Sequence, residues 1–231
     1  METLDTLIVS CSPMRVTLPS RPPDPAPPGE ASADARILTT ARQQLFAYGY
    51  NALTMDDLAH ELGMSKKTLY QHFPGKDAII GLVIDGIGRA VRSELDAILN
   101  DPARTFAQKL RAIVDVVAPR LALLSPAMLR ELQRYAPQIF VKIDELRQKN
   151  IPYVFGRLFR AGIAEGAVRP DLDPDFAALF WLHAVRGLVH PDTLAVTQLT
   201  TQQTLQKAIA LFTTGLLTPA GRKDYEKLFS R

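Results

Sequence analysis

Apolar residues recur at intervals of three and four positions through most of the chain beyond residue 32, and no long stretch alternates with the period of two typical of a strand. In the longest such segment, residues 76 to 99, the apolar side chains form one stripe of a helix: Ile79, Ile80, Val83, Ile87, Val91, Leu95, Ile98 and Leu99. The pattern predicts an all-α protein of about nine helices.

Three short helices are predicted ahead of that long one. The first spans residues 34–48. The second begins after Thr54, which forms a capping box with Asp57 three residues later. The third spans residues 66–72 and is capped by Ser65, after a tight turn that contains a glycine.

The rest of the chain predicts a helical bundle in which prolines mark the helix boundaries. A fifth helix begins at Phe106 and is kinked or ended by Pro119, and the seventh is kinked or interrupted by Pro152. The remaining starts are Pro126 for helix six, Pro137 for helix seven, Pro174 for helix eight, and Thr200 or Thr201 for helix nine, which ends near Leu217.

This organisation divides the chain into four parts. The segment "PSRPPDPAPP" holds six prolines in ten positions, a composition typical of an extended, disordered tail. The predicted parts are a disordered tail over 1–31, a three-helix domain over 32–78, a bundle over 79–218 and a C-terminal tail over 219–231.

Composition narrows the class of protein. The 231 residues have a net charge of +3, too weak a bias to identify a nucleic-acid partner by itself. A single cysteine, Cys11, excludes an internal disulfide framework and suits a reducing cytoplasm. The start lacks the features of a secretory signal, and no stretch approaches the roughly 20 apolar residues of a membrane span. We therefore expect a cytoplasmic protein; Met1 and Met14 are both candidate starts.

The segment "TMDDLAHELGMSKKTLYQHF", residues 54–73, has the layout of a helix-turn-helix, whose second helix enters the major groove of DNA. Its outward positions would present donors, a methyl group and a ring to base edges: Lys66, Lys67, Thr68, Tyr70 and Gln71. A helical hairpin with a solvated basic face is the alternative, since residues 31–76 hold five basic and four acidic side chains.

The longer stretch "LTMDDLAHELGMSKKTLYQHFPGKDAII", residues 53–80, resembles the DNA-binding signature of TetR/AcrR-family transcriptional regulators. The resemblance implies that Lys66, Lys67 and Thr68 contact bases, and that Thr54, Tyr70, His72 and Lys76 hold phosphates. Many relatives have glycine where this chain has Lys67, which leaves the operator sequence open.

The same resemblance implies a homodimer through predicted helices eight and nine, which are apolar on more than one face. It also implies a repressor, associated with the nucleoid, that leaves a palindromic double-stranded DNA operator when a small-molecule effector binds the bundle. The candidate effector residues are polar or large side chains on apolar helices: Arg134, Tyr135, Phe155, Phe159, Trp181, His183 and Arg186. Taken singly, each of these also fits an ordinary core or surface role.

Enzyme motifs are incomplete. "HELGM" begins like the zinc-protease pattern, but Met64 replaces the second histidine. His183 and His190 lie two helical turns apart, too far to share one metal ion. We expect no catalysis, no cofactor and no metal. The alternative to a regulator is a helical carrier or scaffold that does not bind DNA.

Overall fold

The computed structural model describes residues 32–229, which form eleven α-helices and no strand apart from one isolated bridge between Val168 and Leu217. The helices are α1 (Ala33–Tyr48), α2 (Met55–Glu61), α3 (Lys66–His72), α4 (Lys76–Asn100), α5 (Phe106–Ala122), α6 (Pro126–Tyr135), α7 (Pro137–Ala164), α8 (Pro174–Leu188), α9 (Pro191–Thr197), α10 (Thr201–Leu216) and α11 (Pro219–Phe229). The all-α prediction is confirmed. The predicted Pro-rich tail lies outside the described residues.

The three N-terminal helices begin at side-chain caps. The Ser32 hydroxyl accepts a hydrogen bond from the Ala35 amide at 3.2 Å, and Thr54 and Ser65 cap α2 and α3 in the same way. Each cap satisfies an amide that the first helical turn leaves unpaired. Gly63, in the turn between α2 and α3, has φ +64, a left-handed conformation that glycine adopts without steric cost.

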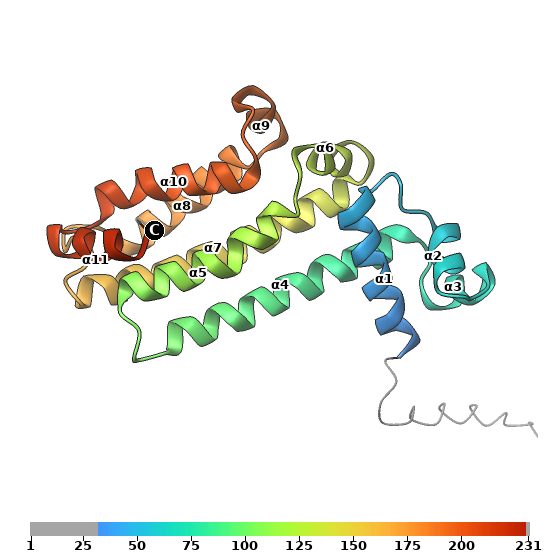
Figure 1. Cartoon of the computed structure of the whole chain (residues 1–231), viewed down its shortest axis with the longest axis horizontal. Helices are drawn as coiled ribbons and strands as arrows, with labels where there is room; N and C mark the ends of the chain where they lie inside the picture. Colours follow the sequence, from blue (N-terminus) through green and yellow to red (C-terminus); the bar gives the residue numbers. More distant parts are fainter. Residues whose placement is uncertain (1–31, 230–231) are drawn as a thin grey trace, which may run out of the picture.

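The long helix α4 extends from the N-terminal domain to the far end of the bundle and packs along α7 (Figure 1). Helices α5 and α7 lie above α4 in this view, and α8 and α10 form a further layer above them. Consequently α1–α3 lie at one end of the molecule and α11 lies at the other.

The helix pattern differs from the prediction in three places. Helix α7 is continuous through Pro152, so the interruption that was one of the two predicted outcomes is absent, because residues on both sides of the proline pack into hydrophobic cores. A short helix, α9, separates the two helices predicted as eight and nine, so the predicted ninth helix is α10. Residues 219–229, predicted as a tail, form α11, whose Tyr225 and Phe229 pack against the bundle core.

Two hydrophobic cores lie at opposite ends of α4. The first gathers α1–α3 with Ile79 and Ile84 of α4, and it also includes Ile139 of α7. The second contains Leu95 of α4 and Val154 of α7. A third, smaller core lies between α6 and α8–α10. The first core therefore continues past residue 78, the predicted boundary of the N-terminal domain.

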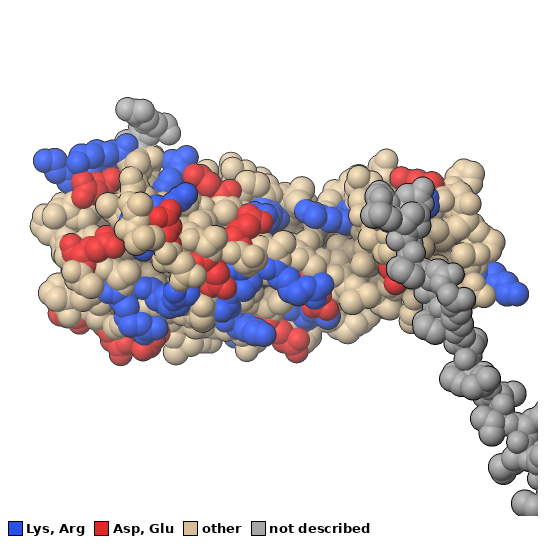
Figure 2. Space-filling model, turned by 90° about the horizontal axis from the view of Figure 1, so that it is seen from below, with Lys and Arg blue, Asp and Glu red and all other residues tan. Residues whose placement is uncertain are grey.

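Charged side chains are unevenly distributed. In the view from below, basic and acidic residues interleave over the bundle, whereas the N-terminal domain shows few charged side chains on this face (Figure 2). Within residues 32–229 no single helix is both long and apolar enough to cross a bilayer, although the bent pair of α5 and α6 reaches that length and composition together.

Candidate nucleic-acid interface and internal cavity

Helices α2 and α3 form a helix-turn-helix whose second helix presents a polar face. The Ser65 hydroxyl accepts a hydrogen bond from the Thr68 amide at 3.0 Å, which fixes the start of α3. Leu69 is fully buried and Phe73 is 6% exposed, so they hold α3 against the domain. The opposite face of α3 points to solvent, as a recognition helix requires.

The five predicted base-reading residues lie on or next to that solvent face. Lys67, Tyr70 and Gln71 are exposed. Lys66 is also exposed, but its ammonium group pairs with Asp56 of α2 at 2.5 Å. The Thr68 hydroxyl lies 2.8 Å from the Ser65 hydroxyl, so it is part of the helix cap.

Three of the four predicted phosphate-binding residues already have partners within the protein, whereas Tyr70 is exposed. The Thr54 hydroxyl donates to Asp57 at 2.6 Å, and His72 Nδ1 lies 2.7 Å from a carboxylate oxygen of Asp34 in α1. Lys76 Nζ donates to the main-chain oxygens of Tyr50 at 3.2 Å and Leu53 at 3.3 Å. An ammonium group has three N–H donors, so these two bonds leave one for a further acceptor.

Tyr50 joins the loop before α2 to the start of α4. Its hydroxyl donates to a carboxylate oxygen of Asp77 at 2.6 Å, and the Lys76 ammonium group lies 4.0 Å from the centre of its ring. Burial raises the pKa of Tyr50, and the hydrogen bond to Asp77 and its negative charge raise it further. These contacts position the first turn of α4 beside the helix-turn-helix.

A cavity of about 220 Å³ lies inside the bundle, and its walls come mainly from α4, α5, α7, α8 and α10. Most lining residues are aliphatic or aromatic, including Ile87 and Val91 of α4. Of the seven predicted effector residues, Phe155 and Trp181 line the cavity, with ring centroids 5.6 Å apart. Phe159 packs against Phe155 at 5.7 Å without lining the cavity.

The other four predicted effector residues lie elsewhere in the structure. Arg134 and Tyr135 are exposed on α6, with the guanidinium group 5.3 Å from the tyrosine ring. His183 is exposed on α8. Arg186 forms two hydrogen bonds of 2.8 Å to the carboxylate of Asp144 on α7, an ion pair between neighbouring helices.

Four polar residues outside the predicted effector set line the cavity, namely Arg42, Arg120, Arg147 and Asn150, and the last two belong to α7. Arg147 lies four residues from Ile143 and from Ile151, on an apolar face of α7. An arginine within an apolar stripe was the available sequence signal. Arg134 and Arg186 were instead selected because of their apolar neighbours.

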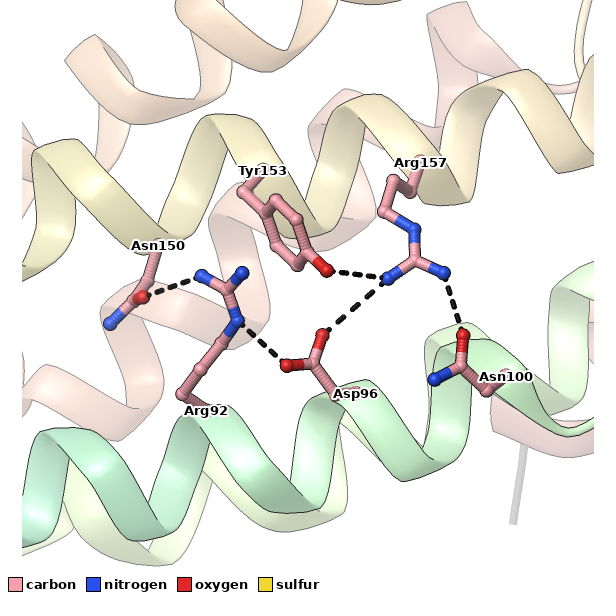
Figure 3. Close-up of polar contacts among 6 residues, drawn as sticks. All are labelled: Arg92, Asp96, Asn100, Asn150, Tyr153 and Arg157. Carbon is pink, nitrogen blue, oxygen red and sulfur yellow. Dashed lines mark hydrogen bonds and ion pairs between the residues drawn. The ribbon is translucent and has the colours of Figure 1, made fainter.

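Polar contacts join α4 to α7 beside the cavity (Figure 3). Arg92 donates to Asp96 at 2.9 Å and to the Asn150 side chain at 3.0 Å. Arg157 donates to Tyr153 and to Asn100, both at 2.7 Å, and lies 3.5 Å from Asp96. The same two helices are joined nearer the N-terminal domain by Lys142 and Asp85 at 2.6 Å.

The arginines of this network control the charge state of Asp96. Desolvation raises the pKa of this carboxyl, but hydrogen bonds with Arg92 and Tyr153 and the charges of Arg92 and Arg157 outweigh it and hold the pKa below its ordinary value. Asp96 therefore stays ionised between the two helices.

A helix-turn-helix with an exposed second helix, joined by one long helix to a bundle with an internal cavity, defines a helix-turn-helix DNA-binding protein. Residues 37–83 match the family model for bacterial regulatory proteins of the tetR family. These residues therefore match a tetR-type DNA-binding region, and this match supports a TetR-family DNA-binding transcriptional regulator.

Individual relatives agree with this assignment. The chain is 23% identical to the uncharacterised HTH-type transcriptional regulator YvaF of Bacillus subtilis over 79% of this chain and 95% of YvaF. Over 71 residues it is 34% identical to the transcriptional regulator EthR of Mycolicibacterium smegmatis, which covers 31% of this chain and 33% of EthR. A transcriptional regulator from Cytophaga hutchinsonii shares the fold, with a TM-score of 0.62 and 20% identity over 79% of this chain and 97% of that one.

Proposed function

We propose that this regulator is a homodimeric repressor that binds a palindromic operator through α3 and leaves it when a small molecule occupies the internal cavity. Helix α4 is the observation that carries the proposal. It begins at Lys76, three residues after the buried Phe73 of the helix-turn-helix, and its Ile84, Gly88 and Leu95 line the cavity. Its 25 residues span about 37 Å at about 1.5 Å per residue, so one helix connects the two sites.

The mechanism we propose is a shift of α4. A ligand that fits one arrangement of α4 and α7 better than another favours that arrangement by the difference in binding free energy. A displacement of α4 would move the helix-turn-helix through Tyr50 and Asp77 and change the separation of the two recognition helices in a dimer. Operator affinity would fall, because both half-sites must be reached at a fixed spacing.

On the DNA side, we propose that Lys66, Lys67, Thr68, Tyr70 and Gln71 face base edges, whereas Thr54, Tyr70, His72 and Lys76 hold phosphates. The exposure of Lys67, Tyr70 and Gln71 supports the first group. The remaining N–H donor of Lys76 supports its place in the second. Lys66 would exchange its exposed pair with Asp56 for a base or phosphate, at little cost.

The dimer would form through α8 and α10. Helix α8 exposes Phe176, Leu179 and Phe180, which are 66%, 46% and 55% exposed, and α10 exposes Leu211 at 79%. Exposed apolar side chains on two neighbouring helices are typical of an interface. His183, predicted to contact the effector, lies on this same outward stripe of α8, so we now assign it to the dimer face.

Selection of bound sequences from random DNA duplexes tests the operator proposal. We expect an enriched two-fold symmetric site, and Lys67→Ala should alter the selected bases. Lys223→Ala is the matched control, because Lys223 is an exposed lysine on α11 at the far end of the molecule. Failure to enrich any site at low salt, with ligand binding retained, would instead support a helical carrier. A promoter carrying the selected site should lose activity when the protein is expressed if it is a repressor.

Sedimentation equilibrium tests the dimer. Phe180→Glu places a charge in the proposed interface and should shift the protein toward monomer. Val141→Glu is the control, because Val141 is similarly exposed, at 53%, but lies on α7. Equal association constants for the two variants would contradict the assignment of α8 to the interface.

A further inference from the structure

The charged residues that line the cavity are all cationic. The lining includes Arg42, Arg120, Arg147 and Asn150 and contains no aspartate or glutamate. Arg120 pairs with Glu94 of α4 at 2.5 Å, and Arg42 is exposed on α1. Among the three arginines, Arg147 is therefore the one that, in the described part of the chain, is neither in an ion pair of this kind nor exposed to solvent.

Arg147 lacks a complete set of partners. Its Nη2 atom is buried and has no hydrogen-bond partner among residues 32–229. Desolvation lowers the pKa of Arg147, the nearby Asp144 opposes this change, and Arg186 adds to it. A buried guanidinium nitrogen without a hydrogen-bond partner is costly, so this part of Arg147 lies in an unfavourable environment.

Asp144, the acid whose charge acts on Arg147, already accepts hydrogen bonds from other side chains. Both carboxylate oxygens of Asp144 accept hydrogen bonds from Arg186, at 2.8 Å each, and one also accepts from Gln148 at 2.8 Å. Asp144 consequently lowers the electrostatic cost of Arg147 without giving Nη2 a hydrogen bond. The cavity thus holds a buried cationic donor within walls that are otherwise mostly apolar.

We propose that the cavity binds an amphipathic monocarboxylate, whose carboxylate pairs with Arg147 and whose aliphatic chain lies against the apolar walls. This inference rests on the proposal that the cavity is the effector site. A carboxylate matches the planar donor arrangement of a guanidinium group, and it supplies the missing acceptor and the missing negative charge together. The cavity volume of about 220 Å³ lies below the roughly 300–1,000 Å³ of drug-sized pockets, which favours a compact chain of medium length.

The position of the carboxylate would also connect the ligand to α4. Asn150, one turn beyond Arg147 on α7, lines the cavity and accepts the hydrogen bond from Arg92 of α4 (Figure 3). A carboxylate at Arg147 would lie close enough to accept from the Asn150 amide. The ligand would thereby change a contact that holds α4 against α7.

Calorimetric titration of the full-length protein with hexanoate, octanoate and decanoate tests the inference, with octan-1-ol and octylamine as neutral and cationic probes of matched length. We expect at least one carboxylate to bind ten-fold or more tightly than octan-1-ol, and octylamine to bind weakest. Binding of octan-1-ol as tightly as the carboxylates would overturn the proposal, and so would failure of all three carboxylates to bind.

Arg147→Met supplies the residue-specific test. Loss of the charge-assisted hydrogen bonds should weaken carboxylate binding by roughly 10- to 100-fold and leave octan-1-ol binding within about three-fold. Without ligand, the variant should unfold at the same or a higher temperature, because methionine removes an unpaired buried charge and keeps most of the volume. Arg130→Met, at an exposed position on α6, is the control for net charge and should bind like the wild type.

The DNA readout separates this inference from the proposed function. Carboxylate binding that depends on Arg147 but leaves operator affinity unchanged would support the ligand class and contradict regulation through the cavity. Release of the operator by another ligand, with no preference for carboxylates, would contradict the ligand class and leave the regulatory proposal intact. Equal carboxylate affinity of a folded Arg147→Met variant would also refute the inference.

Discussion

Two glycines of α4 provide a sharp test of how closely α4 and α7 pack. A Cβ atom at Gly86 would have the Arg89 side chain as its nearest neighbour at 4.0 Å, whereas one at Gly88 would lie 2.9 and 3.0 Å from the two terminal carbons of Leu146 on α7. Both residues lie inside the same helix. Replacement by alanine therefore yields the same gain in helix propensity, about 0.8–1.0 kcal/mol, at each position.

The steric term distinguishes the two variants. Gly86→Ala should raise the free energy of unfolding by about 1 kcal/mol, or the melting temperature by about 2–4 °C. At Gly88, overpacking costs about 1–3 kcal/mol, which cancels or exceeds the same gain. We therefore expect Gly88→Ala to be unchanged or destabilised by up to about 2 kcal/mol, and the displaced Leu146 to narrow the cavity.

Urea unfolding followed by circular dichroism at 222 nm measures both free energies, at one fixed protein concentration because a dimer's stability depends on it. Equal stabilisation by the two substitutions would refute the close contact at Gly88. A double-mutant cycle with Leu146→Ala identifies the partner: the cost of Gly88→Ala should largely disappear when the leucine is absent. A cost that persists would indicate that another group is displaced.

Three further predictions concern contacts that hold neighbouring segments of the fold together. Tyr50→Phe should lower the free energy of unfolding by about 1.5–3 kcal/mol, because the hydrogen bond to Asp77 is lost. Since the pKa of Tyr50 is raised in the folded state, the stability of the wild type should fall as the pH rises above about 10. Urea unfolding at pH 8 to 11 should show a smaller fall in the variant. Because the pKa of Asp96 is lowered in the folded state, its ionised form contributes stability above about pH 4, and this stability is lost as the pH falls through the folded-state pKa. Asp96→Asn should therefore reduce the free energy of unfolding at pH 7 and make it less dependent on pH under acidic conditions. The same dependence on acidic pH in the variant and the wild type would contradict the network. Gly221→Ala places a Cβ 2.1 Å from the main-chain oxygen of Ala167 and should detach α11, seen as faster amide hydrogen exchange confined to that helix; unaltered exchange there would refute the contact.

Local signals predicted the N-terminal half of the fold. Ser65 caps α3 and Thr54 caps α2 as the sequence indicates, because capping depends on residues three positions apart. Contacts over longer separations were not predictable in this way. Pro152 does not break α7, since packing on both sides outweighs the lost hydrogen bond, and α11 is held by Phe229 near Arg111, 118 positions earlier in the chain.

In the candidate site, too, local sequence predicted some features, whereas others depend on contacts between distant helices. Residue types and spacing were sufficient to predict which face of α3 meets solvent. The position of Arg147 in an apolar stripe was visible in the sequence, but its missing hydrogen-bond partner was not, because that depends on the pairing of Arg186 in α8 with Asp144 in α7. Arg186 stands among apolar neighbours and Arg147 among polar ones, so the immediate sequence around each arginine does not indicate which of them lines the cavity.

The first hydrophobic core has a consequence for how such proteins are recombined. It draws Ile84 from α4, Leu132 from α6 and Ile139 from α7, so the DNA-reading helices depend on side chains encoded up to about 60 positions beyond residue 78. A chimera joined at residue 78 would match one protein's recognition helix to another protein's core. Helix α3 and these bundle residues form one packing unit, so we expect that an exchange of DNA specificity must transfer this set of core residues together with α3.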